Sequence, residues 1–379
     1  MTVTESVIEH EASAALVYIA AFGLPGAPDP PPLQLSTTGW AELLREARRH
    51  GLTGLLHWAV LTRRLTGTDE QISAAVEAHL PAAAQTARLE QELAAVSGIL
   101  TEEGIPYRVL KGPAVARLDY PDPEMRTFVD LDVLVPGAAM TAAIRALGML
   151  DYRRRTPAMR ETYDRRFAKS VTVVSDRGLE VDLHRTLVDG PAAALIPLDD
   201  LWADAQRISV GAAQVDTLGQ EQRLLHAAYT VAIANRKTRL NSLRDLAEIL
   251  LSPSVDPVGL LHRVERWDAV PVLARAVGMT WSGLGLDDGL LGWWTQHTGS
   301  PPSKPRPPSG RWARWFDLYG TGDQPFPVLA AETLRLLPPS DRAVFLATVA
   351  YPHRAYLRSR GMGRLAYLKR GTSRLALRG

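Results

Sequence analysis

The chain of 379 residues contains no cysteine. Disulfide bonds, thiolate zinc sites and cysteine-ligated iron–sulfur clusters are therefore excluded. The N-terminal segment has no long apolar run. Its longest apolar run, Ala14–Leu24, has 11 residues, which is too few to span a bilayer as a helix. The N-terminal segment also carries acidic residues where a secretory signal needs positive charge. Together these features predict a cytoplasmic protein without a membrane anchor.

Lysine and net charge are also scarce. Only five of the 43 basic residues are lysines, and together with the abundant alanine this bias is typical of a GC-rich bacterial genome. The net charge of +2 is too small to predict nucleic-acid binding by itself. With 46% hydrophobic and 22% charged residues, the composition is that of a globular protein and not of a disordered one.

Several well-known catalytic motifs are absent. The sequence has no G-x-x-x-x-G-K-[ST] phosphate loop, no G-x-S-x-G nucleophile turn and no H-E-x-x-H zinc helix. The nine histidines are scattered, so no local histidine-rich metal site is predicted. Any chemistry must therefore come from another arrangement of side chains.

The spacing of apolar residues divides the chain into four regions. Residues 1–103 have helical spacing, with Gly51 as a stop between two helices, and predict an N-terminal helical region. Gly104-Ile105-Pro106 interrupts this pattern, and the short β-rich runs that follow predict a small α/β core over residues 104–217. In this core we expect a strand at 129–135 and a hairpin of two strands, 170–175 and 179–187, around Asp176-Arg177-Gly178. Residues 218–299 return to helical spacing, with helices expected at 220–234 and 240–251, and residues 300–379 predict a proline-rich connection and a basic helical region. The predicted fold class is α+β, with a small mixed β-sheet flanked by N-terminal and C-terminal helical regions.

Two aspartates, Asp130 and Asp132, stand two apart in an apolar run that follows a glycine turn. In a strand, residues i and i+2 share a face, so both carboxylates project side by side while Leu131 and Val133 face a core. Two neighbouring carboxylates repel each other unless a cation lies between them. Oxygen ligands favour magnesium or manganese, and magnesium usually keeps positions for substrate phosphates. The run therefore predicts a metal site for a nucleotide.

A third carboxylate lies on the segment LEVDLHR, where Glu180, Asp182 and His184 alternate with apolar residues. If this strand lies beside the one that carries Asp130 and Asp132, Asp182 completes a cluster that can hold one or two metal ions. The cluster can also accept the proton of an attacking hydroxyl. His184 is predicted to orient Asp182 or to touch the nucleotide, and a structural, hydrogen-bonded histidine is the alternative. For both acidic patterns the alternative is the solvated face of a half-buried strand.

Basic residues near the glycine turn extend this prediction. Lys111 precedes Gly112 at a strand-to-helix turn, where backbone N–H groups attract anions, so we expect it to hold a triphosphate. Arg126 is expected to reach the same phosphates with its forked donors. The alternatives are a surface lysine beside a turn and an ordinary loop arginine. Further along, Arg244 and Asp245 form either a local ion pair or a contact to the nucleotide base.

The last eighty residues contain two segments of biased composition. Ser300–Gly310 has five prolines in eleven residues and predicts a semi-rigid surface connection. His353–Gly379 has eight Lys/Arg and no Asp/Glu, with apolar residues interleaved. A disordered basic tail would have fewer apolar residues, so we expect at least one short helix that packs its apolar side on the body. Its arginines would face an anionic acceptor, such as an acidic or phosphorylated peptide or RNA; a solvated helix end is the alternative.

Four pieces of the sequence together carry a resemblance. They are LKG at Leu110–Gly112, the Tyr120-Pro121 pair with Arg126, the DLDVLV run, and VDLH at Val181–His184. This combination resembles the uncharacterised nucleotidyltransferase family of bacteria, within the DNA polymerase β-like superfamily. The order of the regions, a helical start, an α/β core and a helical remainder, is similar to that family as well. The chain departs from better-known members, which carry glycine-serine at the turn and a shorter spacing to the first aspartate. Here Lys111-Gly112-Pro113 forms the turn, with seventeen residues between Gly112 and Asp130.

The resemblance implies a divalent-metal-dependent enzyme that moves a nucleotidyl group from a nucleoside triphosphate to a hydroxyl or phosphate acceptor. Magnesium or manganese is the implied cofactor, and the acceptor is a peptide (some members accompany peptide natural-product genes), a small molecule or RNA. Two alternatives stay open: sugar transfer from a nucleotide-sugar on the same core, and a non-catalytic nucleotide-binding or toxin–antitoxin component. The sequence does not specify the oligomeric state. The predicted site comprises the catalytic and metal-binding carboxylates Asp130, Asp132 and Asp182 and the nucleotide-binding residues Lys111, Gly112, Arg126 and His184.

Overall fold

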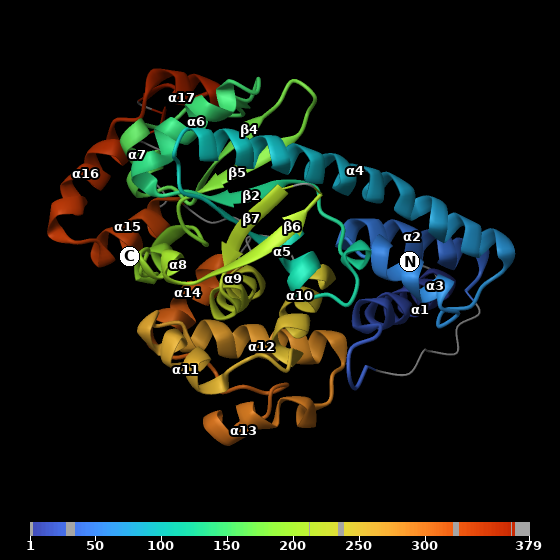
Figure 1. The fold of residues 1–379 in the computed structure, drawn as a ribbon. Coiled ribbons are helices and arrows are strands. Elements are labelled where there is room, and N and C mark those ends of the chain that lie inside the picture. The colour runs from blue at the N-terminus through green and yellow to red at the C-terminus, as the bar shows by residue number, and fades with distance from the viewer. Residues whose placement is uncertain are drawn as a thin grey trace. The chain divides into compact units, whose positions relative to one another are not determined.

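The computed structural model describes six stretches of the chain, residues 3–27, 35–211, 213–233, 239–320, 326–364 and 366–367 (Figure 1). The chain forms two compact units, and each unit is assembled from three separate segments. Unit 1 comprises Met1–Glu90, Lys111–Val129 and Gln220–Ala313. Unit 2 comprises Gln91–Leu110, Asp130–Gly219 and Arg314–Gly379.

Unit 1 is helical. Its elements are α1 (Val3–Ala21), α2 (Thr37–His50), α3 (Thr53–Leu61), most of α4 (Asp69–Glu102), α5 (Lys111–Leu118), η1 (Pro123–Met125), α9 (Gln220–Ile233), α10 (Leu240–Leu251), α11 (Pro257–Arg266), α12 (Val270–Leu284), η4 (Asp288–Leu291), α13 (Gly292–Thr298) and the start of α14 (Gly310–Gly320). α9, α10 and α12 pack against one another, and α1 packs against α2, α10 and α12 (Figure 1). Buried leucine, valine and tryptophan side chains of these helices form the core of the unit.

The helix boundaries in unit 1 follow local signals in the sequence. The Ser36 hydroxyl accepts a hydrogen bond from the Gly39 N–H and so caps the start of α2. Gly51, in a left-handed conformation, ends α2, which confirms the predicted stop there. The helices predicted at 220–234 and 240–251 are confirmed as α9 and α10. α4 continues through Pro81, so this proline does not end the helix.

Unit 2 is built on a mixed sheet of seven strands in the order β3-β4-β5-β2-β1-β7-β6. β2 and β5 pair in parallel, as do β1 and β7, and the remaining neighbours are antiparallel. The α+β fold class and the mixed sheet are therefore confirmed. The strands are β1 (Arg108–Val109), β2 (Leu131–Leu134), β3 (Arg153–Arg154), β4 (Ser170–Val174), β5 (Glu180–His184), β6 (Ala205–Val210) and β7 (Ala213–Leu218).

Alternation of side chains gives the centre of this sheet two different faces. Leu131, Val133, Val181 and Leu183 are fully buried on one face. Asp132, Asp182 and His184 alternate with these residues along the strands and therefore point to the other face. α6 (Met140–Gly148) contacts β3 and β5, with its apolar side chains buried (Figure 1). The predicted strand at 129–135 is confirmed, in a shorter form, as β2.

Two hairpins complete the sheet. β4 and β5 pair around the turn at residues 176–178, where Gly178 has a φ of 77°, and this confirms the predicted hairpin. The β6–β7 hairpin was not predicted. Its strands have the sequences AQRISV and AQVDTL. The first three residues of β6 are exposed, and in this strand only Ile208 and Val210 alternate as buried apolar residues, so the apolar alternation that marks a half-buried strand is short.

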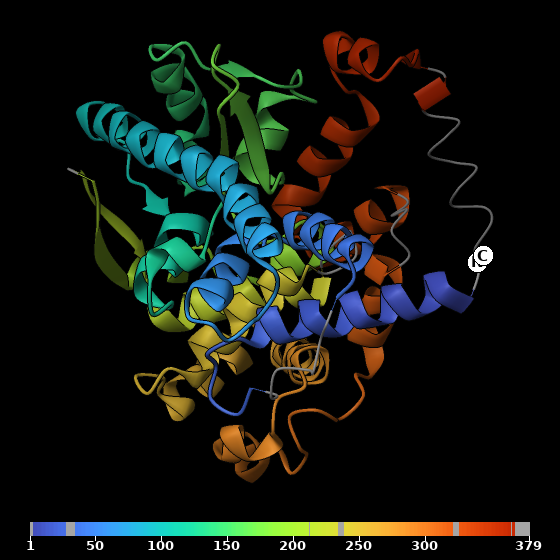
Figure 2. The same ribbon diagram turned by 90° about the vertical axis from the view of Figure 1, so that its right-hand side faces the viewer.

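Helices from the C-terminal third also belong to unit 2. α15 (Phe326–Leu336) packs on η3 (Gly190–Leu195), and α16 (Pro339–Ala350) contacts α7 (Glu161–Arg166). Figure 2 shows α16, in red, beside the part of unit 2 drawn in green. The remaining short elements are η2 (Gly137–Ala139), α8 (Asp200–Ala203) and α17 (Arg354–Ser359).

The basic C-terminal segment begins as predicted. In α17, Leu357 is buried while Arg354 and Arg358 are exposed, which confirms a short helix that packs an apolar residue and turns its arginines outward. The rest of the basic tail from Leu368 lies outside the described residues. Ser300–Gly310 runs without helix or strand up to the start of α14, as predicted. Within the described part of the chain, every helix is too short or too polar to cross a bilayer.

Candidate metal centre

A row of polar side chains crosses three neighbouring strands of unit 2. Asp132 of β2 pairs in register with Asp182 of β5, and Asp182 pairs in register with Thr172 of β4. Because paired residues in a sheet project to the same face, the three side chains lie in one line. The prediction that the strand with Asp182 lies beside the strand with Asp132 is thus confirmed.

Each of the two carboxylates lies within hydrogen-bond distance of a neighbour on the same face. Nε2 of His184 lies 2.6 Å from Oδ1 of Asp132, and the Thr172 hydroxyl donates to Oδ1 of Asp182. His184 has an exposed fraction of 0%, and its Nδ1 lies 3.2 Å from the carbonyl oxygen of Thr186. His184 therefore contacts Asp132, in line with the alternative of a hydrogen-bonded histidine, and its contact with a nucleotide stays a prediction. These contacts hold the carboxylates in fixed orientations.

The donor set suits a divalent cation. One oxygen of Asp132, one oxygen of Asp182 and one ring nitrogen of His184 all lie within 4.8 Å of one another. Carboxylate oxygens and imidazole nitrogen are ordinary ligands of divalent metals, and two adjacent carboxylates are electrostatically stabilised by a cation. Among the described residues this group does not include Asp130, which is half-buried one residue before β2.

The predicted phosphate-binding turn follows directly on the strand beside this cluster. The Leu110 N–H donates to the Asp132 carbonyl oxygen at 2.8 Å, and Lys111 is the next residue of the chain. Lys111 has a φ of 34°, in the left-handed region that residues with a side chain seldom adopt. Gly112 is buried, and a Cβ built there would lie 3.1 Å from the ring of Phe128. The turn thus combines a strained residue with one at which a Cβ would press on the Phe128 ring.

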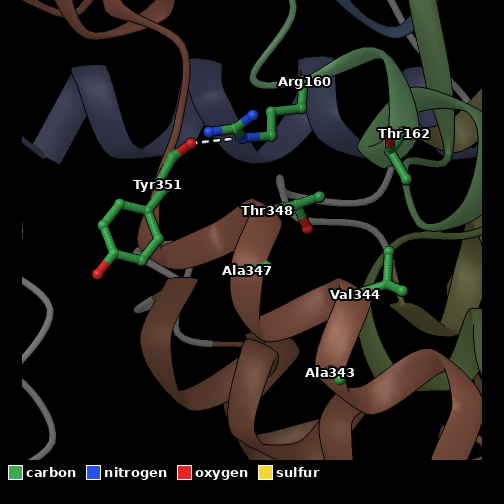
Figure 3. Close-up of a pocket in the computed structure, with 7 residues that line it drawn as sticks. All are labelled: Arg160, Thr162, Ala343, Val344, Ala347, Thr348 and Tyr351. Atoms are coloured by element: carbon green, nitrogen blue, oxygen red, sulfur yellow. Dashed lines mark hydrogen bonds between the residues drawn. The ribbon is translucent and has the colours of Figure 1, made fainter.

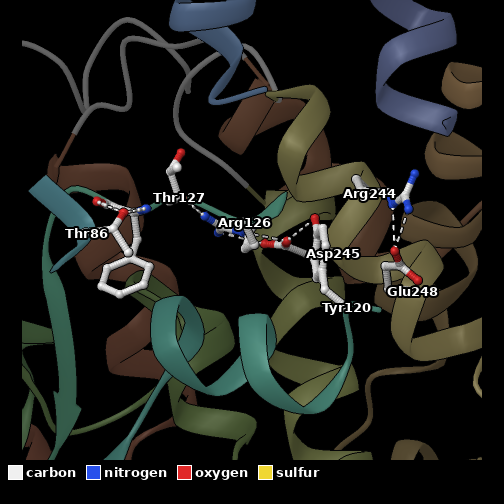
Figure 4. A network of polar contacts seen from close by, with 8 residues as sticks. Thr86, Tyr120, Arg126, Thr127, Arg244, Asp245 and Glu248 are labelled. Carbon is white, nitrogen blue, oxygen red and sulfur yellow. Dashed lines mark hydrogen bonds and ion pairs between the residues drawn. The ribbon is translucent and has the colours of Figure 1, made fainter. Parts of the chain in front are cut away.

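Arg126 lies in a buried network of unit 1 (Figure 4). Its Nε and Nη2 donate to the two carboxylate oxygens of Asp245 at 2.7 and 2.9 Å, and its Nη1 donates to the Thr127 carbonyl oxygen. The Tyr120 hydroxyl donates to the same carboxylate at 2.9 Å. The guanidinium group is therefore engaged within unit 1, and a direct contact between Arg126 and the nucleotide stays a prediction that requires this ion pair to open.

The same network shows which partners Arg244 and Asp245 take. Arg244 donates through Nε and Nη2 to Glu248, and its Nη1 donates to the carbonyl oxygens of Ala20 and Phe22. Figure 4 shows this pair next to the Asp245 cluster. The two neighbours therefore take different partners, and the expected local pair between Arg244 and Asp245 is replaced by pairs with Glu248 and Arg126.

A third buried pair joins Arg223 to Asp119, which lies just after α5. Arg223 donates to both oxygens of Asp119 at 3.1 and 2.8 Å, and the two side chains are 4% and 1% exposed. Burial raises the pKa of Asp119, and the hydrogen bonds from Arg223 oppose that rise. Burial likewise raises the pKa of Glu248, against the effect of Arg244. In both pairs the arginine compensates a charge that would otherwise be costly to bury.

Sequence reasoning missed three of these relationships. Thr172 gave no signal of its own, although its place opposite Asp182 follows once the β4–β5 hairpin is in register. The pairing of His184 with Asp132 depends on the parallel contact between β5 and β2. The pairing of Arg126 with Asp245 spans 119 residues, and no local pattern in the sequence points to it.

Unit 2 also has a groove of about 520 Å³ along α16 and α7, shown in Figure 3. Arg160 lies at its edge and donates through Nε to the Tyr351 carbonyl oxygen at 2.5 Å. The lining contains no carboxylate, so its chemistry differs from that of the cluster on β2 and β5. The lining residues are Arg160, Thr162, Ala343, Val344, Ala347, Thr348 and Tyr351.

Comparison with known proteins assigns the family. Among curated proteins none matches the chain. Among solved structures, the chain is similar to the crystal structure of an antigenic nucleotidyltransferase-like protein from Paracoccidioides brasiliensis, at 16% identity and a TM-score of 0.29, over 51% of this chain and 92% of that one. Residues 36–281 match the family described as "Uncharacterised nucleotidyltransferase", a stretch that covers more than half of the chain and all of the predicted site residues. The chain belongs to the uncharacterised nucleotidyltransferase family.

Proposed function

We propose that this protein is a metal-dependent nucleotidyltransferase of the DNA polymerase β-like type, which moves a nucleotidyl group from a nucleoside triphosphate to a hydroxyl or phosphate acceptor. One observation carries the proposal: in a chain of a nucleotidyltransferase family, Asp132 and Asp182 stand side by side in register on adjacent parallel strands. Adjacent carboxylates arranged in this way suit a cation that in turn binds the phosphates of a nucleotide.

The carboxylates have the leading roles in this proposal. Asp132 and Asp182 hold the cation, and Asp130 adds a further carboxylate from the start of the same strand. When bound, magnesium or manganese neutralises phosphate charge and orients the triphosphate. Asp182 is proposed to accept the proton of the acceptor hydroxyl. The hydroxyl oxygen of the acceptor attacks the α-phosphorus, and pyrophosphate leaves. The Thr172 hydroxyl and His184 keep the two carboxylates in position for these tasks.

The turn at Lys111 and Gly112 is proposed to receive the triphosphate. It follows on Leu110, whose N–H is bonded to the Asp132 carbonyl oxygen, and its backbone is strained at Lys111. Strained residues that the surrounding fold keeps in place are common in ligand-binding turns. Lys111 would neutralise charge that develops on the phosphates, and the absence of a side chain on Gly112 would let the backbone approach them.

Transfer assays with labelled nucleotides test the proposal. The protein is incubated with each of the four triphosphates labelled at the α-phosphorus or at the γ-phosphorus, with Mg²⁺ or Mn²⁺, and with peptide, small-molecule and RNA acceptors. Mass spectrometry then identifies the products. We expect the α label, and not the γ label, to appear on an acceptor, and we expect Asp132→Asn to abolish the transfer. Asp176→Asn, a change of an exposed aspartate in the turn between β4 and β5, serves as the matched control and should keep full activity.

Parallel thermal-shift measurements separate the donors. Nucleoside triphosphates with a divalent metal should raise the unfolding temperature, because ligands that bind only the native state stabilise it. A rise with nucleotide-sugars alone would contradict nucleotidyl transfer and favour sugar transfer. Absence of any rise with metal and nucleotide, together with absence of labelled product, would favour a non-catalytic protein.

A further inference from the structure

We propose that His184 binds the divalent cation directly through Nε2, and that this nitrogen makes the site prefer Mn²⁺ to Mg²⁺. The inference rests on the proposed metal site and adds to it a ligand and a metal selectivity. The predicted metal set consisted of three aspartates, whereas the three side chains that converge in the structure are Asp132, Asp182 and His184.

The position of His184 is that of a ligand. It stands two residues after Asp182 on β5, so both side chains project from the same face of the sheet. Its ring is fully buried, and Nε2 faces Oδ1 of Asp132 at 2.6 Å. The remaining ligand oxygen, on Asp182, is within 4.8 Å of both. A cation held by the two carboxylates therefore has the imidazole nitrogen within reach.

The other ring nitrogen supports the same role. Nδ1 of His184 lies 3.2 Å from the Thr186 carbonyl oxygen, which can only accept a hydrogen bond. Histidines that bind metals almost always donate their second ring N–H to a carbonyl or carboxylate, because this contact fixes the tautomer and the direction of the free nitrogen. Thr186 thereby directs Nε2 of His184 towards the carboxylates.

Ligand chemistry then gives the selectivity. Mg²⁺ binds oxygen ligands in a near-ideal octahedron and gives up its water reluctantly. Imidazole suits transition metals, and affinity for nitrogen and oxygen sites rises from Mn²⁺ along the first transition row. One nitrogen among the ligands therefore favours Mn²⁺ over Mg²⁺, whereas an all-carboxylate set discriminates less between them.

The competing account is that His184 only orients Asp132 by a hydrogen bond. The two accounts differ in a measurable way. Loss of an orienting contact weakens the binding of both metals by a similar factor, and factors of about 10 to 100 are usual for such contacts. Loss of a nitrogen ligand weakens Mn²⁺ binding more than Mg²⁺ binding and so lowers the ratio of the two affinities.

Electron spin echo spectroscopy of the unsubstituted protein tests the ligand directly. The full chain is loaded with one equivalent of Mn²⁺, and the modulation from directly bound nitrogen is recorded with natural-abundance and with ¹⁵N-labelled histidine. We expect a ¹⁴N modulation that is replaced by a ¹⁵N signal on labelling. The signal should disappear in Asp182→Asn and persist in His262→Ala, which changes an exposed histidine of α11. Bound Mn²⁺ without histidine nitrogen in its coordination shell would overturn the inference.

Metal competition tests the selectivity. Free Mn²⁺ is measured by electron paramagnetic resonance while Mg²⁺ is added, for the unsubstituted protein and for His184→Gln. In this variant a side-chain amide of similar length replaces the imidazole and its Nε2. We expect Mn²⁺ to bind about tenfold or more tightly than Mg²⁺, and we expect this ratio to fall by about tenfold in the variant. An equal loss for both metals, or an unchanged ratio, would overturn the inference.

These outcomes are separable from the fate of the proposed function. Metal-dependent transfer of the α label with equal affinity for Mn²⁺ and Mg²⁺ would refute the histidine ligand and leave the nucleotidyltransferase standing. A histidine-bound Mn²⁺ without any transfer would support the ligand and refute the proposed reaction. Absence of Mn²⁺ binding, with and without nucleotide, would overturn both.

Discussion

Two carboxylates in this protein, Asp132 and Asp245, have the same burial but different neighbouring side chains. The side chains of Asp132 in unit 2 and Asp245 in unit 1 are equally exposed, at 11% each. Asp245 accepts two hydrogen bonds from the guanidinium of Arg126, whereas Asp132 faces the imidazole of His184. We therefore propose that the neighbouring side chain, and not depth in the fold, distinguishes the structural aspartate Asp245 from the metal-binding aspartate Asp132.

The network in unit 1 illustrates the structural case. Asp119, Asp245 and Glu248 each accept two hydrogen bonds from one arginine. Such pairs are nearly neutral in stability when complete, and strongly destabilising when one partner is removed. In unit 2, a hydroxyl and an imidazole orient the carboxylates of Asp182 and Asp132. The carboxylates of Asp132 and Asp182 stand side by side, and two adjacent carboxylates are stabilised by a cation, so that site suits one.

Removing one carboxylate of the cluster should have the largest effect. Asp182→Asn keeps the size of the side chain and its contact with Thr172 but removes a carboxylate that we propose binds the metal. We expect metal-dependent turnover to fall by about a thousandfold, since a catalytic metal supplies several kcal/mol of stabilisation to the transition state. The unfolding free energy should change by less than about 1 kcal/mol, because one of two neighbouring like charges is removed. Urea unfolding and the labelled-nucleotide assay measure the two effects.

A control and a contrary result for Asp182→Asn test whether its carboxylate differs from the structural carboxylates of unit 1. Asp176→Asn should leave both quantities unchanged, because Asp176 is exposed in the β4–β5 turn. An Asp182→Asn variant with normal turnover and greatly reduced stability would place Asp182 with the structural carboxylates.

Removing a carboxylate from the network in unit 1 should act on stability. Asp245→Ala leaves the guanidinium of Arg126 buried without its carboxylate, and also removes the acceptor of the Tyr120 hydroxyl. We expect a loss of about 3 kcal/mol or more in unfolding free energy. Urea unfolding measures the loss, and Mn²⁺ affinity of the folded variant should be unchanged.

A double variant sharpens this prediction. Arg126→Met combined with Asp245→Leu removes both charges and fills their space with apolar atoms. We expect most of the stability to return, because replacing a buried ion pair by apolar groups is often neutral. If the double variant is stable and binds a triphosphate normally, the prediction that Arg126 contacts the nucleotide is wrong; weaker triphosphate binding would support it.

A smaller effect is expected at Thr172, which we propose acts on the metal through its hydrogen bond to Asp182. Thr172→Val removes the hydroxyl that donates to Asp182 and keeps the shape of the side chain. We expect metal affinity to fall by about tenfold, as for other contacts that orient a ligand. Thr172→Ser retains the hydroxyl and should keep nearly full affinity. Calorimetric metal titration compares the two, and equal affinities for both variants would show that the contact has no role.

The smallest effect concerns the turn after β1. In Gly112→Ala the new Cβ would lie 3.1 Å from the Phe128 ring, so the ring must shift by a few tenths of an ångström. Crowding of this kind should cost about 1 kcal/mol of unfolding free energy. Gly98→Ala, where the new Cβ meets nothing within 4 Å, should cost nothing. Weaker binding of a triphosphate by Gly112→Ala alone, measured by calorimetry, would link the turn to phosphate binding.

Local patterns predicted the strands of the cluster well. The alternation around Asp132 and Asp182 placed both on strands with the aspartates on one face, and the β4–β5 turn was evident from Asp176-Arg177-Gly178. Gly51 and the apolar spacing of α9 and α10 likewise gave their boundaries. Each of these signals extends over fewer than about fifteen residues, where periodicity and turn chemistry dominate.

Long-range pairings could not be predicted in the same way. The partner of Arg126 lies 119 residues away, and the partner of His184 lies 52 residues away. A sequence pattern states which face a side chain takes, but the strand order decides what it meets there. The β6–β7 hairpin was missed for a different reason: its strands are polar and half exposed, so the apolar alternation that identifies a strand is weak.

Anomalous diffraction from crystals grown with Mn²⁺ and a non-hydrolysable nucleoside triphosphate tests the central claim most directly. Data collected at the manganese absorption edge locate the ion independently of any assumption about its ligands. The account predicts a peak within about 2.0–2.3 Å of carboxylate oxygens of Asp132 and Asp182 and of Nε2 of His184. A peak elsewhere, or an empty cluster in crystals that contain bound nucleotide, would contradict the assignment of these carboxylates to a metal.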